Sequence, residues 1–154
     1  MGYFRAEDTI SGREGRAYAT INGKVEEMFY VKTLEASVEK GKTEVKMLGH
    51  RGTQHKANGW KGTGSMTIYY VTTLFRQMML DYIKTGKDAY FDIQIVNEDP
   101  ASSIGKQTVV LKHVNLDKVL VGKVDTESEI LDESIDFTFD DLDILDSFAA
   151  PSQA

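Results

Sequence analysis

The sequence contains no cysteine, and this absence excludes disulfide bonds, thiolate metal sites and cysteine nucleophiles together. No apolar run approaches the roughly 18 residues that a bilayer span requires, so no membrane partner is expected. The start of the chain, MGYFRAEDTISGREGR, lacks the apolar core of a secretory signal, and Ala6 stands where a myristoylation motif needs Ser or Thr. We therefore expect an intracellular protein.

The nucleotide-binding and hydrolase motifs are also missing. Gly59 and Gly64 have the glycine spacing of a phosphate-binding loop, but Ser65 stands where that motif requires lysine. Neither GxGxxG nor GxSxG occurs. These glycines are better explained as turns and points of close backbone approach.

The histidines and carboxylates do not form a recognisable chemical site. His50 and His55 are five residues apart, which fits neither one helical face nor alternate strand positions, and His113 is distant. Asp136 and Asp140 alternate with apolar residues as a solvated strand face does. The sequence predicts no metal, no cofactor and no catalysis.

Length and composition indicate one globular domain over residues 1–154. The chain is 41% hydrophobic and 27% charged, with a net charge of −6. All 18 Lys and Arg residues lie at or before Lys123, whereas 10 of the 24 acidic residues lie from Asp125 onward. This acidic end is either a solvated face or a surface that repels another polyanion.

Short strands dominate the pattern. Asn22-Gly23 between two strand-like runs predicts a β-hairpin. Residues 60–70 alternate as an amphipathic strand, and the apolar positions of 135–139 alternate with acidic or hydroxyl positions. Turns are predicted at 39–42 and 115–117, with a further strand over 118–124.

One helix of about three turns is expected between 74 and 85. Its apolar residues recur in steps of three and four, Thr72 or Thr73 can cap the start, and Gly86 suits the left-handed position at the end. Leu80 falls on the polar side, as an exposed leucine or an interface contact. Seven to nine strands and one helix predict a mainly β fold, a β-barrel or two packed antiparallel sheets with a flanking α-helix.

The stretch GHRGTQHKANGWKGTGS, residues 49–65, is cationic and glycine-rich. We interpret 41–59 as a long interaction loop, because loops of this length in compact domains usually have a function or are disordered. Residues 1–15 are interpreted as an N-terminal arm and 147–154 as a flexible tail. A small-ligand barrel stays open as an alternative, as does a nucleic-acid platform built on Tyr69 and Tyr70.

Several long segments together resemble one known family. GREGRAYATINGKVEEMFYVKTLEA, GHRGTQHKANGWKGTGSMTIYYVT, YIKTGKDAYFDIQIVNEDPASSIGKQTVVLKHVNLDKV and FTFDDLDIL resemble the XkdM-like tail tube proteins of contractile phages and PBSX-type elements. The resemblance covers about residues 3 to 148. It implies hexameric rings that stack into a tube for the passage of duplex DNA, with sheath, tape measure and baseplate proteins as further partners. It also implies assembly in the bacterial host cytoplasm; a type VI-like or bacteriocin tube is the nearest alternative.

The resemblance also suggests where subunits meet. The candidate contacts are Tyr3, Phe4, Arg5, His50, Arg51, Lys56, Trp60 and Leu80. We expect Arg51, Lys56 and Lys61 to meet the acidic C-terminal part of a neighbour, and we expect a net acidic channel wall.

Overall fold

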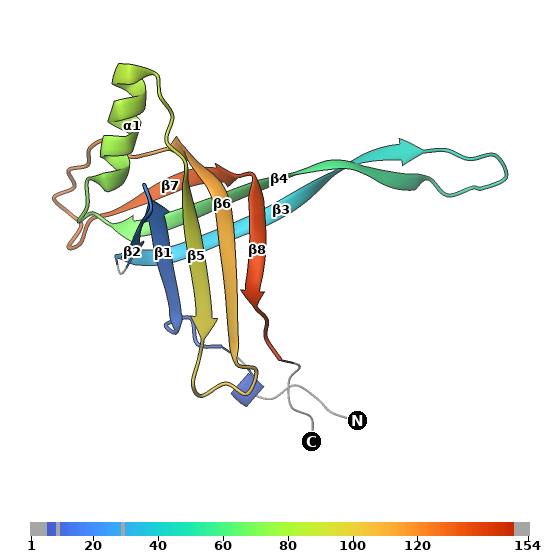
Figure 1. The fold of residues 1–154 in the computed structure, drawn as a ribbon, viewed down its shortest axis with the longest axis horizontal. Coiled ribbons are helices and arrows are strands. Elements are labelled where there is room, and N and C mark those ends of the chain that lie inside the picture. Colours follow the sequence, from blue (N-terminus) through green and yellow to red (C-terminus); the bar gives the residue numbers. More distant parts are fainter. Residues whose placement is uncertain (1–5, 9, 29, 150–154) are drawn as a thin grey trace.

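The fold is built almost entirely from antiparallel strands. The computed structural model describes residues 6–8, 10–28 and 30–149 (Figure 1). The elements are a 3-10 turn η1 (Ala6–Asp8), β1 (Gly15–Ile21), β2 (Lys24–Glu27), β3 (Val31–Val45), β4 (Gln54–Tyr69), α1 (Leu74–Thr85), β5 (Phe91–Glu98), β6 (Lys106–Lys118), β7 (Asp132–Phe139) and β8 (Asp141–Asp146).

The strands form two layers that share β6. One layer has the order β2-β1-β5-β6-β8, and the other has the order β6-β7-β4-β3. Figure 1 shows the strands of the two layers crossing at a steep angle, with α1 at one end of them. The predicted mainly β fold with one flanking helix is confirmed.

Both layers and the helix supply the core. Its buried side chains are Ala17, Ala19, Met28, Met66, Ile68, Phe75, Phe91, Ile93, Leu111, Val114, Ile135, Phe137 and Phe139. The alternation predicted for 60–70 and 135–139 is confirmed from Gly62 and Ile135 onward, since every second side chain is turned inward. Burial of these apolar surfaces is the main favourable contribution to folding.

Two glycines of β4 let the phenylalanines of β7 lie against the backbone. Gly62 is paired with Phe139 and Gly64 with Phe137. A Cβ atom at either position would collide with the ring of the paired phenylalanine. The glycines of this strand therefore serve close packing, as the sequence predicted.

Strand β6 changes layers instead of turning back. The predicted turn at 115–117 is wrong, because Asn115 and Leu116 continue β6 and pair with β7. The change of direction occurs at His113, which has φ 59° and lies between the part of β6 that pairs with β8 and the part that pairs with β7. Strands commonly pass between crossed sheets through such irregular residues.

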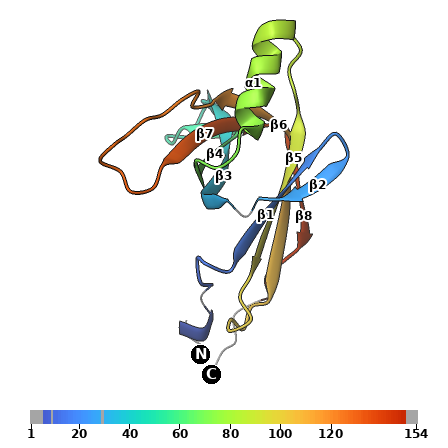
Figure 2. The ribbon, with the colours of Figure 1, turned by 90° about the vertical axis from the view of Figure 1, so that its left-hand side faces the viewer.

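The predicted strand over 118–124 is also wrong beyond Lys118. Residues 119–131 form no strand and arch away from the sheets before β7 begins (orange in Figure 2). Val121 and Val124 are exposed there. Alternating valines do not make a strand when no neighbouring strand is available to accept their hydrogen bonds.

The local signals for the first hairpin and the helix are confirmed. Asn22 and Gly23 both have positive φ, as a two-residue turn between β1 and β2 requires. Gly86 ends α1 with φ 73°, and its N–H donates to the Tyr82 carbonyl at 2.8 Å. At the other end, the Leu74 N–H donates to the hydroxyl of Thr72 at 3.2 Å.

The largest correction concerns the predicted loop at 41–59 and the turn at 39–42. Residues up to Val45 belong to β3 and residues from Gln54 belong to β4, so only 46–53 lies outside the strands. Asn58 is the extra residue of a bulge, because Gly41 pairs with Gly59 and Lys42 with Ala57. This part of the hairpin is exposed on both faces and so lacks the alternation that reveals a half-buried strand.

Candidate assembly surfaces

The two layers end in strand edges that no other described segment pairs with. Strand β3 is a 15-residue strand that pairs with β4, and β8 pairs with β6. In the described part of the chain, the far edges of both strands carry no sheet partner. An unpaired edge of this length is a surface for pairing with another chain.

The β3–β4 hairpin reaches far beyond the body of the molecule. Figure 1 shows it continuing past β8 as a two-stranded ribbon that ends in a turn. The amide of Asn58 donates to the hydroxyl of Thr43 at 2.7 Å across the bulge, and the His50 ring is hydrogen-bonded to the Gly52 carbonyl at 2.8 Å. The ribbon is therefore an ordered arm, although it buries almost nothing within one subunit.

The hairpin carries four of the predicted contact residues in separate places. His50 and Arg51 lie in the turn, Lys56 lies on β4 opposite Thr43, and Trp60 lies at the base of the ribbon. The Trp60 ring packs against Phe139 at a centroid distance of 6.3 Å and is still 47% exposed. The structure thus brings the cations together near the tip and keeps the tryptophan at the base.

Sequence reasoning missed two apolar residues at the tip. Met47 and Leu48 are exposed in the turn, and Leu48 is exposed completely. The sequence did contain a signal for them, because two adjacent apolar residues are unusual in a turn, and turns that carry them often form contacts.

An apolar hollow lies at the base of the same hairpin. It has a volume of about 390 Å³ and is lined by Val38, Lys40, Ala57, Gly59, Trp60 and Leu142. Its existence follows from the length of the hairpin, because the inward face of β3 and β4 continues past β8, the last strand of the opposite layer. Val38 is 47% exposed there although it shares the inward face of the core residues.

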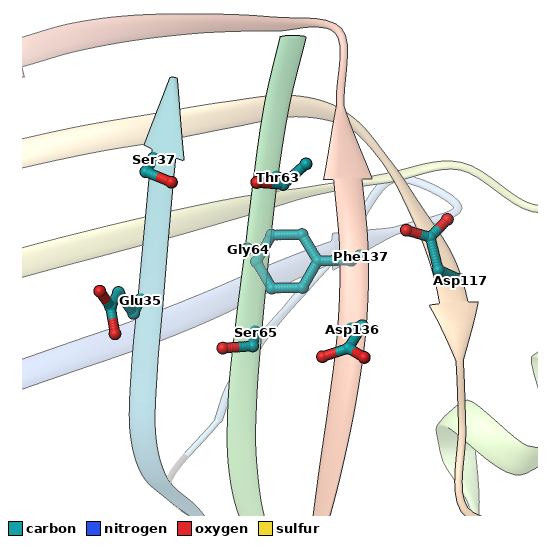
Figure 3. Close-up of a pocket in the computed structure, with 8 residues that line it drawn as sticks. All are labelled: Glu35, Ser37, Thr63, Gly64, Ser65, Asp117, Asp136 and Phe137. Atoms are coloured by element: carbon teal, nitrogen blue, oxygen red, sulfur yellow. The ribbon is translucent and has the colours of Figure 1, made fainter. Parts of the chain in front are cut away.

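The outer face of the β3, β4 and β7 strands is polar around its centre. A shallow hollow of about 350 Å³ lies on it, lined by Glu35, Ser37, Thr63, Gly64, Ser65, Asp117, Asp136 and Phe137 (Figure 3). The lining contains three carboxylates, three hydroxyls and no cation. The lining of this hollow is therefore locally negative, and Lys61 lies on the same face of β4 outside it.

Several acidic residues of the C-terminal part are paired within the subunit. Asp143 lies beside Lys112 and raises the pKa of that lysine. Lys32 hydrogen-bonds to Asp132, and together with Lys123 it lowers the pKa of this carboxyl below its ordinary value. The expected contact between the cations of the hairpin and the acidic end stays a prediction about neighbouring subunits.

A second group of exposed apolar residues lies on α1. Phe75 is buried, whereas Leu80, Tyr82 and Ile83 are exposed. The helix is fixed to the sheet at its start, where Arg76 forms a buried ion pair with Glu133 of β7. Leu80 lies on this helix, away from the cations of the hairpin tip.

Tyr3, Phe4 and Arg5 lie outside the described residues. Tyr70, considered for base stacking, lies beneath the Arg76 guanidinium at 4.5 Å. Ala149, in the predicted flexible tail, donates its N–H to the Ile104 carbonyl at 2.8 Å.

The described residues offer neither a metal-binding cluster nor a membrane-spanning helix. No group of three or more His, Asp or Glu side chains in this part of the chain is arranged to hold a metal ion. None of its helices has the length and apolar character of a bilayer span.

The fold recurs in solved tube structures. A chain of the anti-feeding prophage cap structure matches with a TM-score of 0.69 over 94% of this chain and 96% of that chain, at 11% identity. A chain of the PVC sheath-tube complex matches with a TM-score of 0.62 over 90% and 93%, at 14% identity. The SPP1 tail tube structure matches with a TM-score of 0.62 over 94% and 81%, at 9% identity. At these identities the likeness shows the fold.

The sequence comparisons give the family. The chain is 46% identical over 140 residues to the phage-like element PBSX protein XkdM of Bacillus subtilis (strain 168), covering 91% of this chain and 92% of that protein. An uncharacterised protein YqbM of the same organism is equally similar. The family model described as phage tail tube protein matches residues 2–146. The resemblance seen in the sequence is confirmed, and the chain belongs to the phage tail tube protein family.

Proposed function

We propose that this chain is the structural subunit of a hollow tail tube, built from hexameric rings that stack along one axis. The observation that carries the proposal is the free edge of β3, 15 residues long in the described structure. A monomer with such an edge is prone to uncontrolled association. In a closed ring of identical contacts, each free edge is covered by a neighbouring subunit. The role is structural, with no chemical step.

The outer face of β3, β4 and β7 would line the bore. Neither the helix nor the other layer covers this face (Figure 1), and its central hollow carries carboxylates and hydroxyls without a cation. Duplex DNA has one negative charge per roughly 1.7 Å of axis, so a basic wall would hold it through many phosphate contacts. An acidic wall lets the genome slide.

The β3–β4 hairpin would reach an adjacent subunit or ring. Its cations Arg51 and Lys56 are exposed and have no ion-pair partner among the described residues. Asp141 of β8 in a neighbour, which has no ion-pair partner among the described residues, offers a partner of opposite charge. The N-terminal arm around Tyr3, Phe4 and Arg5 is a second candidate for the same task.

Electron microscopy of the concentrated protein tests the proposal. We expect negatively stained rings or tubes with an open centre and sixfold symmetry in end views. Monomers at every protein and salt concentration would refute self-assembly, and closed particles without a bore would refute the tube.

Charge reversal tests the role of the hairpin. Arg51→Glu with Lys56→Glu should reduce tube growth while circular dichroism of the subunit stays unchanged. Lys84→Glu with Lys87→Glu, which changes the net charge equally at the end of α1, is the control. Tubes of unchanged length would contradict a role for the hairpin cations.

A second charge change tests the lining of the bore. Tubes of the Ser37→Lys, Ser65→Lys variant should retain duplex DNA at low salt, whereas wild-type tubes should release it. A tube structure in which lysines line the bore would overturn the acidic channel. Sheath, tape measure and baseplate proteins would be the further partners, and assembly would take place in the bacterial cytoplasm. The alternative function is the tube subunit of a type VI-like secretion or bacteriocin system.

A further inference from the structure

The tip and the base of the β3–β4 hairpin have complementary chemistry. The tip presents Met47 and Leu48 to solvent, and the base contains the apolar hollow defined above, with the half-exposed Trp60 and Val38 in its wall. Exposed apolar surfaces that face each other across an interface supply much of the energy of association. We infer that the Met47–Leu48 tip of one subunit inserts into the apolar hollow of a second copy of this chain.

A subunit cannot fill its own hollow. The lining of the hollow reaches from Val38, seven residues before the end of β3, to Ala57, three residues after the start of β4. Paired strand therefore separates it from the turn by roughly 10 to 24 Å at the ordinary rise of about 3.4 Å per residue. The two-stranded ribbon would have to fold back on itself and lose its pairing. The occupant must therefore be another molecule.

Charge favours the tip over the other exposed apolar surfaces. Residues 46–53 contain Lys46, His50 and Arg51 and no carboxylate. The neighbouring β8, which contributes Leu142 to the hollow, has three carboxylates. Asp143 and Asp146 are paired with Lys112 and Lys106, whereas Asp141, directly before Leu142, has no ion-pair partner among the described residues. Charges at an exposed edge act over a distance of about 8–10 Å at physiological salt, so the cations of the tip need not touch β8 to be attracted by it.

The contact has a direct consequence for assembly. It joins two different patches, and every subunit carries one copy of each, so each subunit both donates a tip and accepts one. A contact of this heterologous type either closes into a ring or propagates as an open filament. The inference depends on the proposed tube function. It adds the two surfaces through which hairpins connect subunits, namely the Met47–Leu48 tip and the apolar hollow.

Cysteine cross-linking tests the contact directly, because the chain has no cysteine of its own. The Leu48→Cys, Val38→Cys double variant, oxidised with copper phenanthroline at assembling concentration, should give a ladder of dimers, trimers and larger species on a non-reducing gel. Either single variant should give at most dimers. The matched control is Ile83→Cys with Val38→Cys, because Ile83 is an equally apolar and exposed residue on α1.

The outcomes separate this inference from the proposed function. A ladder from the Leu48 pair alone supports it, and the Leu48→Ser, Met47→Ser variant should then show at least a tenfold loss of sedimentable tubes with its circular dichroism unchanged. Tubes that form without a Leu48–Val38 ladder, or a ladder from the Ile83 control instead, overturn the inference and leave the tube intact. The absence of any assembly overturns both.

Discussion

Removal of Arg76 should destabilise the subunit more than the loss of an ordinary surface charge. The Arg76 side chain is 15% exposed and that of its partner Glu133 is 1% exposed. Glu133 Oε1 is already buried without a hydrogen-bond partner in the described structure. With Arg76→Met, the carboxylate would stay buried with its main compensating charge removed, which costs about 3–5 kcal/mol. For a domain of this size that corresponds to a fall in Tm of roughly 6–20 °C.

The assay is urea and thermal unfolding followed by circular dichroism, at a protein concentration where sedimentation shows monomer, because assembly would raise the apparent stability. The Arg76→Met, Glu133→Leu double variant should recover most of the loss, since no unpaired charge stays buried. Lys112→Met is the control, because Lys112 and Asp143 are both about half exposed and should contribute little. An Arg76→Met variant within about 1 kcal/mol of the wild type would refute the reasoning.

Three further changes test the packing, the helix end and the electrostatics. Gly64→Ala should cost about 1–3 kcal/mol in urea unfolding, because the new Cβ would collide with the Phe137 ring; a neutral variant would show that the ring can move. Gly86→Ala should cost about 1–2 kcal/mol in the same assay, because Gly86 has φ 73°, and an unchanged midpoint would contradict this. The lowered pKa of Asp132 means that its pairing stabilises the fold above the ordinary carboxyl pKa near 4 and that this contribution is lost as the pH falls through the lower folded value. The Asp132→Asn variant should therefore lose less stability than the wild type as the pH falls below about 4, and identical pH profiles would count against the pairing with Lys32.

The sequence determined those features in which a local pattern reports a local environment. Alternation in 60–70 and 135–139 identified half-buried strands, because period two places alternate side chains on opposite faces. Asn22-Gly23 identified the first hairpin, and Gly86 identified the end of α1, because few residues adopt positive φ easily. The family was also visible, since long stretches of the chain carried the resemblance.

Only the tertiary structure decided features that depend on a partner elsewhere in the chain. Residues 118–124 could continue as a strand only if a neighbouring strand accepted their hydrogen bonds. The pairing within 41–59 leaves no alternating pattern in the sequence, because neither face of that hairpin is buried. The ion pair of Arg76 joins residues 57 positions apart, so no local period encodes it. The apolar hollow likewise exists because β3 and β4 extend beyond the layer that covers them. This depends on the relative lengths of the strands and on how the layers cross, and no single segment encodes it.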